Sequence, residues 1–215
     1  MYKPNKISDS VPKINKFSEL PEIKNGLYIF DIDETLLVFE EVSDVWWKRS
    51  FEQIYAETGD VEYASNKMKK LFADIVKTHK PEPTDIDGFK IIEDNLDENN
   101  NTLVFLTARP ESLEVETYRQ IADLPIKYSH PIYFSGDKGL KIKWLINTVN
   151  ADKHFQSVIF VDDKIYNIED VQKECPSVQC FQFIPDDYIA KVNSKKSDNK
   201  IDAAAADAAA VTVLK

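Results

Sequence analysis

The sequence has few cysteines, and the ones it has match no redox or metal-binding pattern. Cys175 and Cys180 are the only two among 215 residues. Their spacing fits neither a C-x-x-C redox pair nor the four-ligand pattern of structural zinc. We therefore expect two free thiols, with a disulfide between them as the less favoured alternative.

Long apolar runs are also missing. No window of about 18 consecutive apolar residues occurs, so no membrane-spanning helix is predicted. Segment 1–17 is polar and lacks the apolar core of a signal peptide. These absences favour a cytoplasmic protein; a processed form, or a protein exported without a signal, would have the same sequence features.

Positive charge is scarce, with 27 Lys and Arg against 37 Asp and Glu and a net charge of −10. A field of this sign repels the phosphate backbone of nucleic acids and anionic membranes, so neither is an expected partner. A small anionic substrate is still compatible, because a nearby lysine or metal ion acts strongly at short range. The sequence leaves the oligomeric state open.

Short apolar runs are present instead, and they alternate with helical patterns. Residues 27–30 suit a strand buried on both faces, and this run stops at Asp31 and Asp33. Further strands are predicted at 102–106, 132–134, 157–161 and 178–183, with helices at about 111–122, 140–149 and 168–173 between them. The alternation predicts an α/β fold, a three-layer sandwich around a parallel, Rossmann-like sheet.

A helical hairpin interrupts this pattern. Its first helix begins at Ser43 or Asp44 and ends at Gly59, and its second covers about 61–79 before Pro81 and Pro83. The aromatic residues of the first helix either form the core of the hairpin or contact a substrate; they are Trp46, Trp47, Phe51 and Tyr55.

The predicted domains follow from this insertion. Residues 1–38 and 101–192 form the α/β core, 39–100 form a helical cap, and 193–215 are an Ala-rich tail with little to bury. The lead-in up to about residue 25 is expected to be irregular, with Phe17 as a contact to the domain. Within the cap range, Asp85 and Asp87 form a D-x-D that no strand precedes, so we expect these acids to cap a helix.

Polar residues follow four of the predicted strands: Asp31 and Asp33, then Thr107, then Lys138, then Asp162 and Asp163. In a parallel sheet the carboxyl ends of the strands lie along one edge, so these residues converge there. The pattern resembles the haloacid dehalogenase (HAD) superfamily of phosphotransferases, whose motifs are D-x-D-x-T, a Thr or Ser, a Lys and an acidic pair. The resemblance covers about residues 27–183.

This resemblance implies a role for each residue. Asp31 would attack phosphorus and form an aspartyl phosphate, and Asp33 would be the general acid and base. Thr107 would donate a hydrogen bond to a phosphoryl oxygen, and Lys138 would screen charge at the nucleophile. Lys141 is the alternative lysine. Mg²⁺ would be held by Asp31, the backbone carbonyl of Asp33, and Asp162, with Asp163 acting through water.

Two further expectations concern specificity. Arg109 either touches the substrate or pairs with a nearby acid. Asp33 points to a phosphatase or phosphomutase, because the resemblance implies that ATPases and dehalogenases lack this acid. The cap favours a small phosphorylated substrate. The alternatives are an effector or binding protein with little turnover, and a protein phosphatase.

Overall fold

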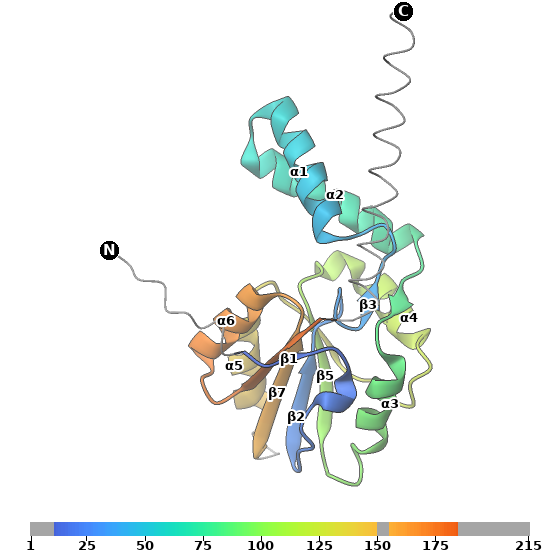
Figure 1. The fold of residues 1–215 in the computed structure, drawn as a ribbon, viewed down its shortest axis with the longest axis vertical. Helices are drawn as coiled ribbons and strands as arrows, with labels where there is room; N and C mark the ends of the chain where they lie inside the picture. Colours follow the sequence, from blue (N-terminus) through green and yellow to red (C-terminus); the bar gives the residue numbers. More distant parts are fainter. Residues whose placement is uncertain (1–10, 150–154, 185–215) are drawn as a thin grey trace, which may run out of the picture.

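The computed structural model describes residues 11–149 and 155–184, and these form a six-stranded parallel sheet with the order β1-β8-β7-β2-β5-β6 (Figure 1). The strands, in sheet order, are Lys13–Ile14, Gln179–Phe183, Ser157–Asp162, Gly26–Phe30, Thr102–Thr107 and Ile132–Phe134. Strand β2 lies inside the sheet between β7 and β5, and all five of its residues are buried. The prediction that its apolar run is covered on both faces is confirmed.

Alternate residues of β2 face two separate cores. Tyr28 and Phe30 pack on the face covered by α3 (Ile86–Asp94) and α4 (Glu114–Ala122). Leu27 and Ile29 pack on the face covered by α5 (Lys138–Val149) and α6 (Ile165–Glu174). The chain therefore forms the three-layer α/β sandwich that the alternation of strands and helices predicts.

The edge strand β1 differs from the expected irregular lead-in. Lys13 and Ile14 pair in parallel with Gln182 and Phe183 of β8. The 3-10 helix η1 (Phe17–Glu19) follows, and the buried ring of Phe17 stacks on that of Phe183 with centroids 4.4 Å apart. A two-residue strand is too short to leave a periodic pattern, so its place depends on contacts with β8.

The helical hairpin is α1 (Asp44–Thr58) followed by α2 (Val61–Thr78), and it projects from the sheet in Figure 1. The hydroxyl of Ser43 accepts from the backbone N–H of Trp46, so Ser43 is the N-cap of α1. Gly59 ends α1 with φ of 65°, a left-handed conformation that favours glycine. The connections to the core, β3 (Leu37–Val38) and β4 (Glu82–Pro83), pair antiparallel.

Side chains of the hairpin pack with core residues at its base. The cluster contains buried Phe39, Val42, Val76 and Leu113, with Trp46, Trp47 and Phe72 packed against it. Leu113 belongs to η2 (Glu111–Leu113), which precedes α4. Of the two predicted roles, core packing or substrate contact, Trp46 and Trp47 have the packing role. The rings of Phe51 and Tyr55 stack on each other.

Helix α3 lies within range 39–100 but packs on the sheet. Phe89, Ile92 and Leu96 are buried in the same cluster as Phe30. Asp85 is the N-cap of α3, as predicted, and its carboxylate accepts from the backbone N–H of Gly88 and from that of Phe17. The domain division at residues 38 and 101 stays a prediction.

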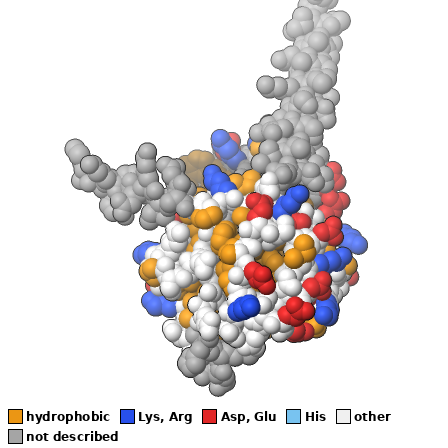
Figure 2. Space-filling view, turned by 60° about the horizontal axis from the view of Figure 1, so that its bottom comes forward, with side chains coloured by type: hydrophobic (Ala, Val, Ile, Leu, Met, Phe, Trp, Pro, Cys, Tyr) orange, Lys and Arg blue, Asp and Glu red, His pale blue; other side chains and the backbone are white. Residues whose placement is uncertain are grey.

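Both cysteines are free and buried, as predicted. In the part of the chain that is described, no helix is long and apolar enough to span a membrane. The face shown in Figure 2 carries scattered basic side chains among acidic ones. The predicted Ala-rich tail lies outside the described residues.

Candidate active site

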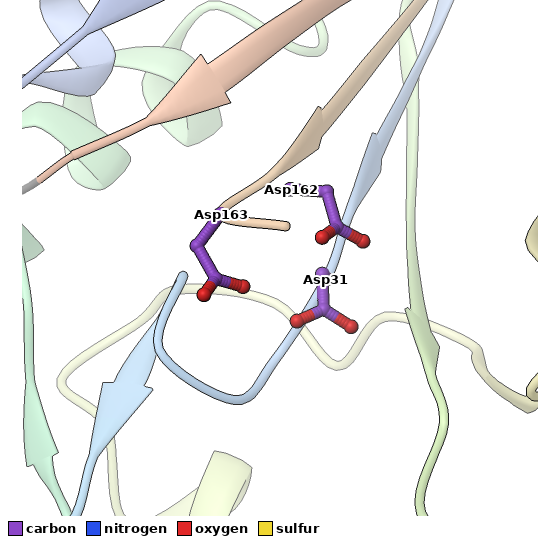
Figure 3. Close-up of side chains that lie close together, drawn as sticks. All are labelled: Asp31, Asp162 and Asp163. Atoms are coloured by element: carbon purple, nitrogen blue, oxygen red, sulfur yellow. The ribbon is translucent and has the colours of Figure 1, made fainter. Parts of the chain in front are cut away.

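Three carboxylates meet where two neighbouring strands end. Asp31 follows β2, Asp162 ends β7, and Asp163 comes next (Figure 3). The backbone N–H of Asp31 donates to the carbonyl of Val161, which continues the pairing of β2 with β7. One carboxylate oxygen from each of the three lies within 4.8 Å of the others. The convergence expected at the carboxyl edge of the sheet is therefore present for these acids.

These acids hold their protons more tightly than isolated ones do. Burial, with the charges of Asp162 and Asp33, raises the pKa of Asp31 to about 7 against the opposing effect of Lys138. Burial, with the charges of Asp31, Asp162 and Glu34, raises the pKa of Asp163 to about 9 although Lys164 opposes it. Burial also raises the pKa of Asp162. Three crowded carboxylates, of which Asp31 and Asp162 are buried and Asp163 is partly buried, therefore need additional positive charge.

The lysine in the site is Lys138, the first residue of α5. It is 1% exposed, and its Nζ lies 2.5 Å from Oδ1 of Asp31 and 3.9 Å from Oδ2 of Asp162. It also donates to the carbonyl of Leu106. The alternative, Lys141, instead places its Nζ 4.1 Å from the ring centroid of Trp144. Of the two lysines, only Lys138 contacts the predicted nucleophile in the described residues.

Asp33 and Arg109 form a bidentate ion pair. Nη2 of Arg109 lies 2.7 Å from Oδ1 of Asp33, and Nε lies 2.9 Å from Oδ2. Arg109 is 2% exposed, and the Asp33 side chain is 24% exposed. The carboxylate of Asp33 is not among the three that cluster. Of the two predictions for Arg109, pairing with a nearby acid is the one seen here, and substrate contact stays a prediction.

Thr107 lies at the end of β5 and is fully buried. Its hydroxyl oxygen accepts from the backbone N–H of Arg109 at 3.1 Å. Thr107 lies at the carboxyl edge of the sheet, as predicted. Its hydrogen bond also orients the turn that leads to Arg109, and so supports the ion pair between Arg109 and Asp33.

Sequence reasoning missed several residues that hold the acids in place. Both oxygens of Asp162 accept from Nδ2 of Asn167 at 3.0 Å. Nζ of Lys164 lies 2.9 Å from Oδ2 of Asp163, and Lys164 also pairs with Glu34. The hydroxyl of Thr35 accepts from the backbone N–H of Asp163. Thr35 is the last residue of the D-x-D-x-T motif, so the motif could have indicated its role. Lys164 and Asn167 lie at the start of α6, where no sequence pattern distinguishes them.

The ligand atoms fit a hard divalent cation. Asp31, Asp162 and Asp163 offer only oxygen, and Oδ1 of Asp163 is buried without a hydrogen-bond partner among the described residues. Mg²⁺ favours oxygen ligands and commonly uses one or two carboxylates with water and phosphate. These three side chains could hold such an ion, and the participation of the Asp33 backbone carbonyl stays a prediction.

Several solved structures are similar to this chain. A chain of the Pnkp1/Rnl/Hen1 complex has 14% identity and a TM-score of 0.43 over 82% of this chain, which spans half of that chain. A HAD-superfamily hydrolase from Ehrlichia chaffeensis has 16% identity and a TM-score of 0.44, covering 80% of this chain and 96% of its own. The HAD domain of the effector Lem4 from Legionella pneumophila, an inactive mutant, has 12% identity and a TM-score of 0.39, covering 77% and 86%.

Comparison with curated proteins gives no significant match. A family model described as "Protein of unknown function (DUF2608)" matches residues 5–135 and 132–214. These segments include both carboxylate-bearing strands and the helical hairpin. The chain therefore belongs to the DUF2608 family of proteins of unknown function.

Proposed function

We propose that this chain is a Mg²⁺-dependent phosphomonoester hydrolase with Asp31 as its nucleophile. The main support for the proposal is that Asp31, Asp162 and Asp163 cluster beside the buried Lys138, whose Nζ contacts Asp31. A carboxylate beside a cation and two further acids suits attack on a phosphoryl group whose charge must be neutralised.

The reaction has two steps. One oxygen of Asp31 attacks phosphorus, the bond to the leaving oxygen breaks, and Asp33 gives that oxygen a proton. Water then attacks the aspartyl phosphate, Asp33 takes the proton of the water, and the bond between Asp31 and phosphorus breaks to release inorganic phosphate. Lys138 and Thr107 stabilise charge on the phosphoryl oxygens. Asp31, Asp162 and Asp163 would hold Mg²⁺, which would supply positive charge that polarises the phosphoryl group.

The position of the hairpin supports the proposal that the substrate is a small phosphorylated molecule. Helices α1 and α2 rise above the sheet on two connections: β3, which begins four residues after Asp33, and β4 (Figure 1). A helical cap over the site would restrict access to it and exclude water.

A second candidate is a binding or effector protein with little turnover, and the Asp33 pair favours it. Both oxygens of Asp33 accept from Arg109, so this pair uses part of the hydrogen-bonding capacity that the proposed acid would otherwise offer to a leaving group.

The test is phosphate release from a panel of aryl phosphates, phosphorylated metabolites and phosphopeptides, with Mg²⁺ and with EDTA. We expect Mg²⁺-dependent release, a loss on the order of 10⁴-fold or more in Asp31→Asn, and a loss of about 10²–10⁴-fold in Asp33→Asn. Asp87→Asn, which changes an exposed acid of the other D-x-D, is the matched control. Release from phosphopeptides alone would favour a protein phosphatase. Absence of Asp31-dependent release from every substrate would favour the binding protein.

A further inference from the structure

A chain of hydrogen bonds connects the helical hairpin to Asp33. Oε1 of Gln120 accepts from Nη1 of Arg109 at 2.7 Å, and Nε2 of Gln120 donates to the backbone carbonyl of Val76 at 2.7 Å. Gln120 is buried on α4, and Val76 lies in the last turn of α2. Arg109 in turn holds Asp33 with two nitrogens. These hydrogen bonds thus lead from the hairpin at one end to Asp33, the proposed general acid, at the other.

Glutamine suits this position chemically. A guanidinium group only donates hydrogen bonds and a carbonyl only accepts them, so the side chain between them must accept on one side and donate on the other. The carbonyl of Val76 is one of the last four of α2, which have no partner within the helix. Gln120 therefore joins a buried cation to a helix end that requires a donor.

The hydrogen bond between Gln120 and Val76 crosses the contact between the hairpin and the core. Val76 from α2 and Leu113 from η2 are both buried in the cluster at the base of the hairpin, together with Phe39. The ring of Phe39 lies under the guanidinium of Arg109, with Cζ 5.8 Å from the ring centroid. A shift of α2 relative to α4 would lengthen or break the Val76 bond, because that hydrogen bond joins α2 directly to Gln120.

In the described part of the chain, Arg109 has one other side-chain partner on α4. Its Nη1 also donates to the hydroxyl of Thr117 at 3.2 Å, and Thr117 donates to the carbonyl of Leu113. Among the residues that the structure describes, this second contact stays within the core and makes no hydrogen bond to the hairpin. Gln120 is therefore the member of the pair that can transmit the position of the hairpin.

We propose that Gln120 is a positioning residue: it orients Arg109, and through it the carboxylate of Asp33, only while the end of α2 rests on α4. This inference depends on the proposed function, in which Asp33 protonates the leaving oxygen. Without Gln120, Asp33 is oriented less well for that proton transfer. The rate of phosphate release should therefore fall most for substrates whose leaving group must be protonated.

The experiment compares an aryl phosphate, whose leaving group departs easily, with an alkyl phosphate, whose leaving group requires protonation. We expect Gln120→Met to lower kcat/KM for the alkyl phosphate about tenfold more than for the aryl phosphate, because misplaced proton donors are costly. Gln120→Glu keeps the acceptor for Arg109 but loses the donor to Val76, so it should also lower kcat/KM more for the alkyl phosphate, because the bond to α2 is broken. Gln53→Met, at an exposed position of α1, is the matched control and should leave the ratio unchanged. Equal losses on both substrates would overturn the positioning role.

A second readout does not depend on activity. In Asp33→Asn the pair with Arg109 is weakened, so we expect faster amide hydrogen exchange in residues 73–79 at the end of α2, and the same in Gln120→Met and Gln120→Glu. Gln53→Met should exchange there as the unmodified chain does. Unchanged exchange in Asp33→Asn and Gln120→Met would overturn the link to the hairpin. A chain without phosphatase activity that still showed this coupled exchange would refute the proposed function alone.

Discussion

At the scale of single residues, Asp163 combines two unfavourable conditions. Its Oδ1 is buried without a hydrogen-bond partner among the described residues, and Asp31 and Asp162 lie close by. Its pKa is raised to about 9, mainly by burial. Lys164, which contacts it, also pairs with Glu34 and would keep that partner if the Asp163 charge were removed. The carboxylate therefore costs stability that a bound cation would restore.

We predict that Asp163→Asn stabilises the metal-free chain by about 1–3 kcal/mol at pH 8, because the amide cannot ionise and so removes the cost of placing a carboxylate beside Asp31 and Asp162. Between the unfolded pKa of 3.8 and the folded value of about 9, the folded state binds more protons than the unfolded state, so this cost grows as the pH rises. The gain should accordingly be smaller at pH 4. Thermal unfolding in EDTA at both pH values measures it.

Adding Mg²⁺ should raise the melting temperature of the unmodified chain and have little effect on Asp163→Asn, because a ligand that binds only the folded state stabilises it. Asp123→Asn, at an exposed carboxylate of α4's end, should behave as the unmodified chain does in both buffers. A destabilised Asp163→Asn in EDTA would contradict the prediction.

At the scale of elements, α3 holds the loop before β6 through one buried acid. The carboxylate of Glu93, 1% exposed, accepts from the backbone N–H groups of Lys127 and Tyr128 at 2.6 and 2.8 Å. Its Oε1 also lies 3.0 Å from Nε2 of buried His130. One side chain thus accepts from two backbone N–H groups, contacts buried His130, and connects a helix inside range 39–100 to the loop before β6.

Removing that side chain should be costly. We predict that Glu93→Ala lowers the free energy of unfolding by about 3 kcal/mol, because two backbone N–H groups lose their acceptor and buried His130 loses its partner. Glu93→Gln keeps one acceptor oxygen and should lose less. Urea denaturation measures both, and Asp94→Ala, at the exposed neighbouring position, serves as control. A loss in Glu93→Ala no greater than that of Asp94→Ala would refute this role of α3.

At the scale of the whole molecule, the two thiols report on global unfolding. Cys175 and Cys180 lie in the core between the sheet and helices α5 and α6. Burial raises the pKa of both thiols, that of Cys180 to about 12. Only the thiolate reacts readily, so both the burial and the raised pKa protect these cysteines in the folded state.

We predict that neither thiol reacts with Ellman's reagent at pH 8 in the folded chain and that both react once it is unfolded. In increasing urea, the fraction reacted in a short pulse should follow the loss of tryptophan fluorescence. The neutral thiol of Cys180 is favoured in the folded state, so stability should also fall as the pH rises above about 9. Rapid reaction of either cysteine in the absence of urea would contradict its burial.

The sequence alone determined where most strands run and where they end. A strand buried on both faces must be continuously apolar, and a carboxylate at its end is a visible interruption, so the positions of Asp31 and Asp162 could be read directly. Helix caps are equally local, because Ser43 and Asp85 bond backbone groups three residues away. The sheet and the candidate acids therefore followed from patterns a few residues long.

Only the tertiary structure decided which partners those acids have. Arg109 and Asp33 are 76 residues apart, and Gln120 and Val76 are 44 apart, so no periodic pattern records either contact. The same holds for β1, whose two residues form a strand only because β8 lies beside them. Local spacing encodes secondary structure and its ends, whereas side-chain pairing across elements depends on how the layers pack, and that requires the whole fold.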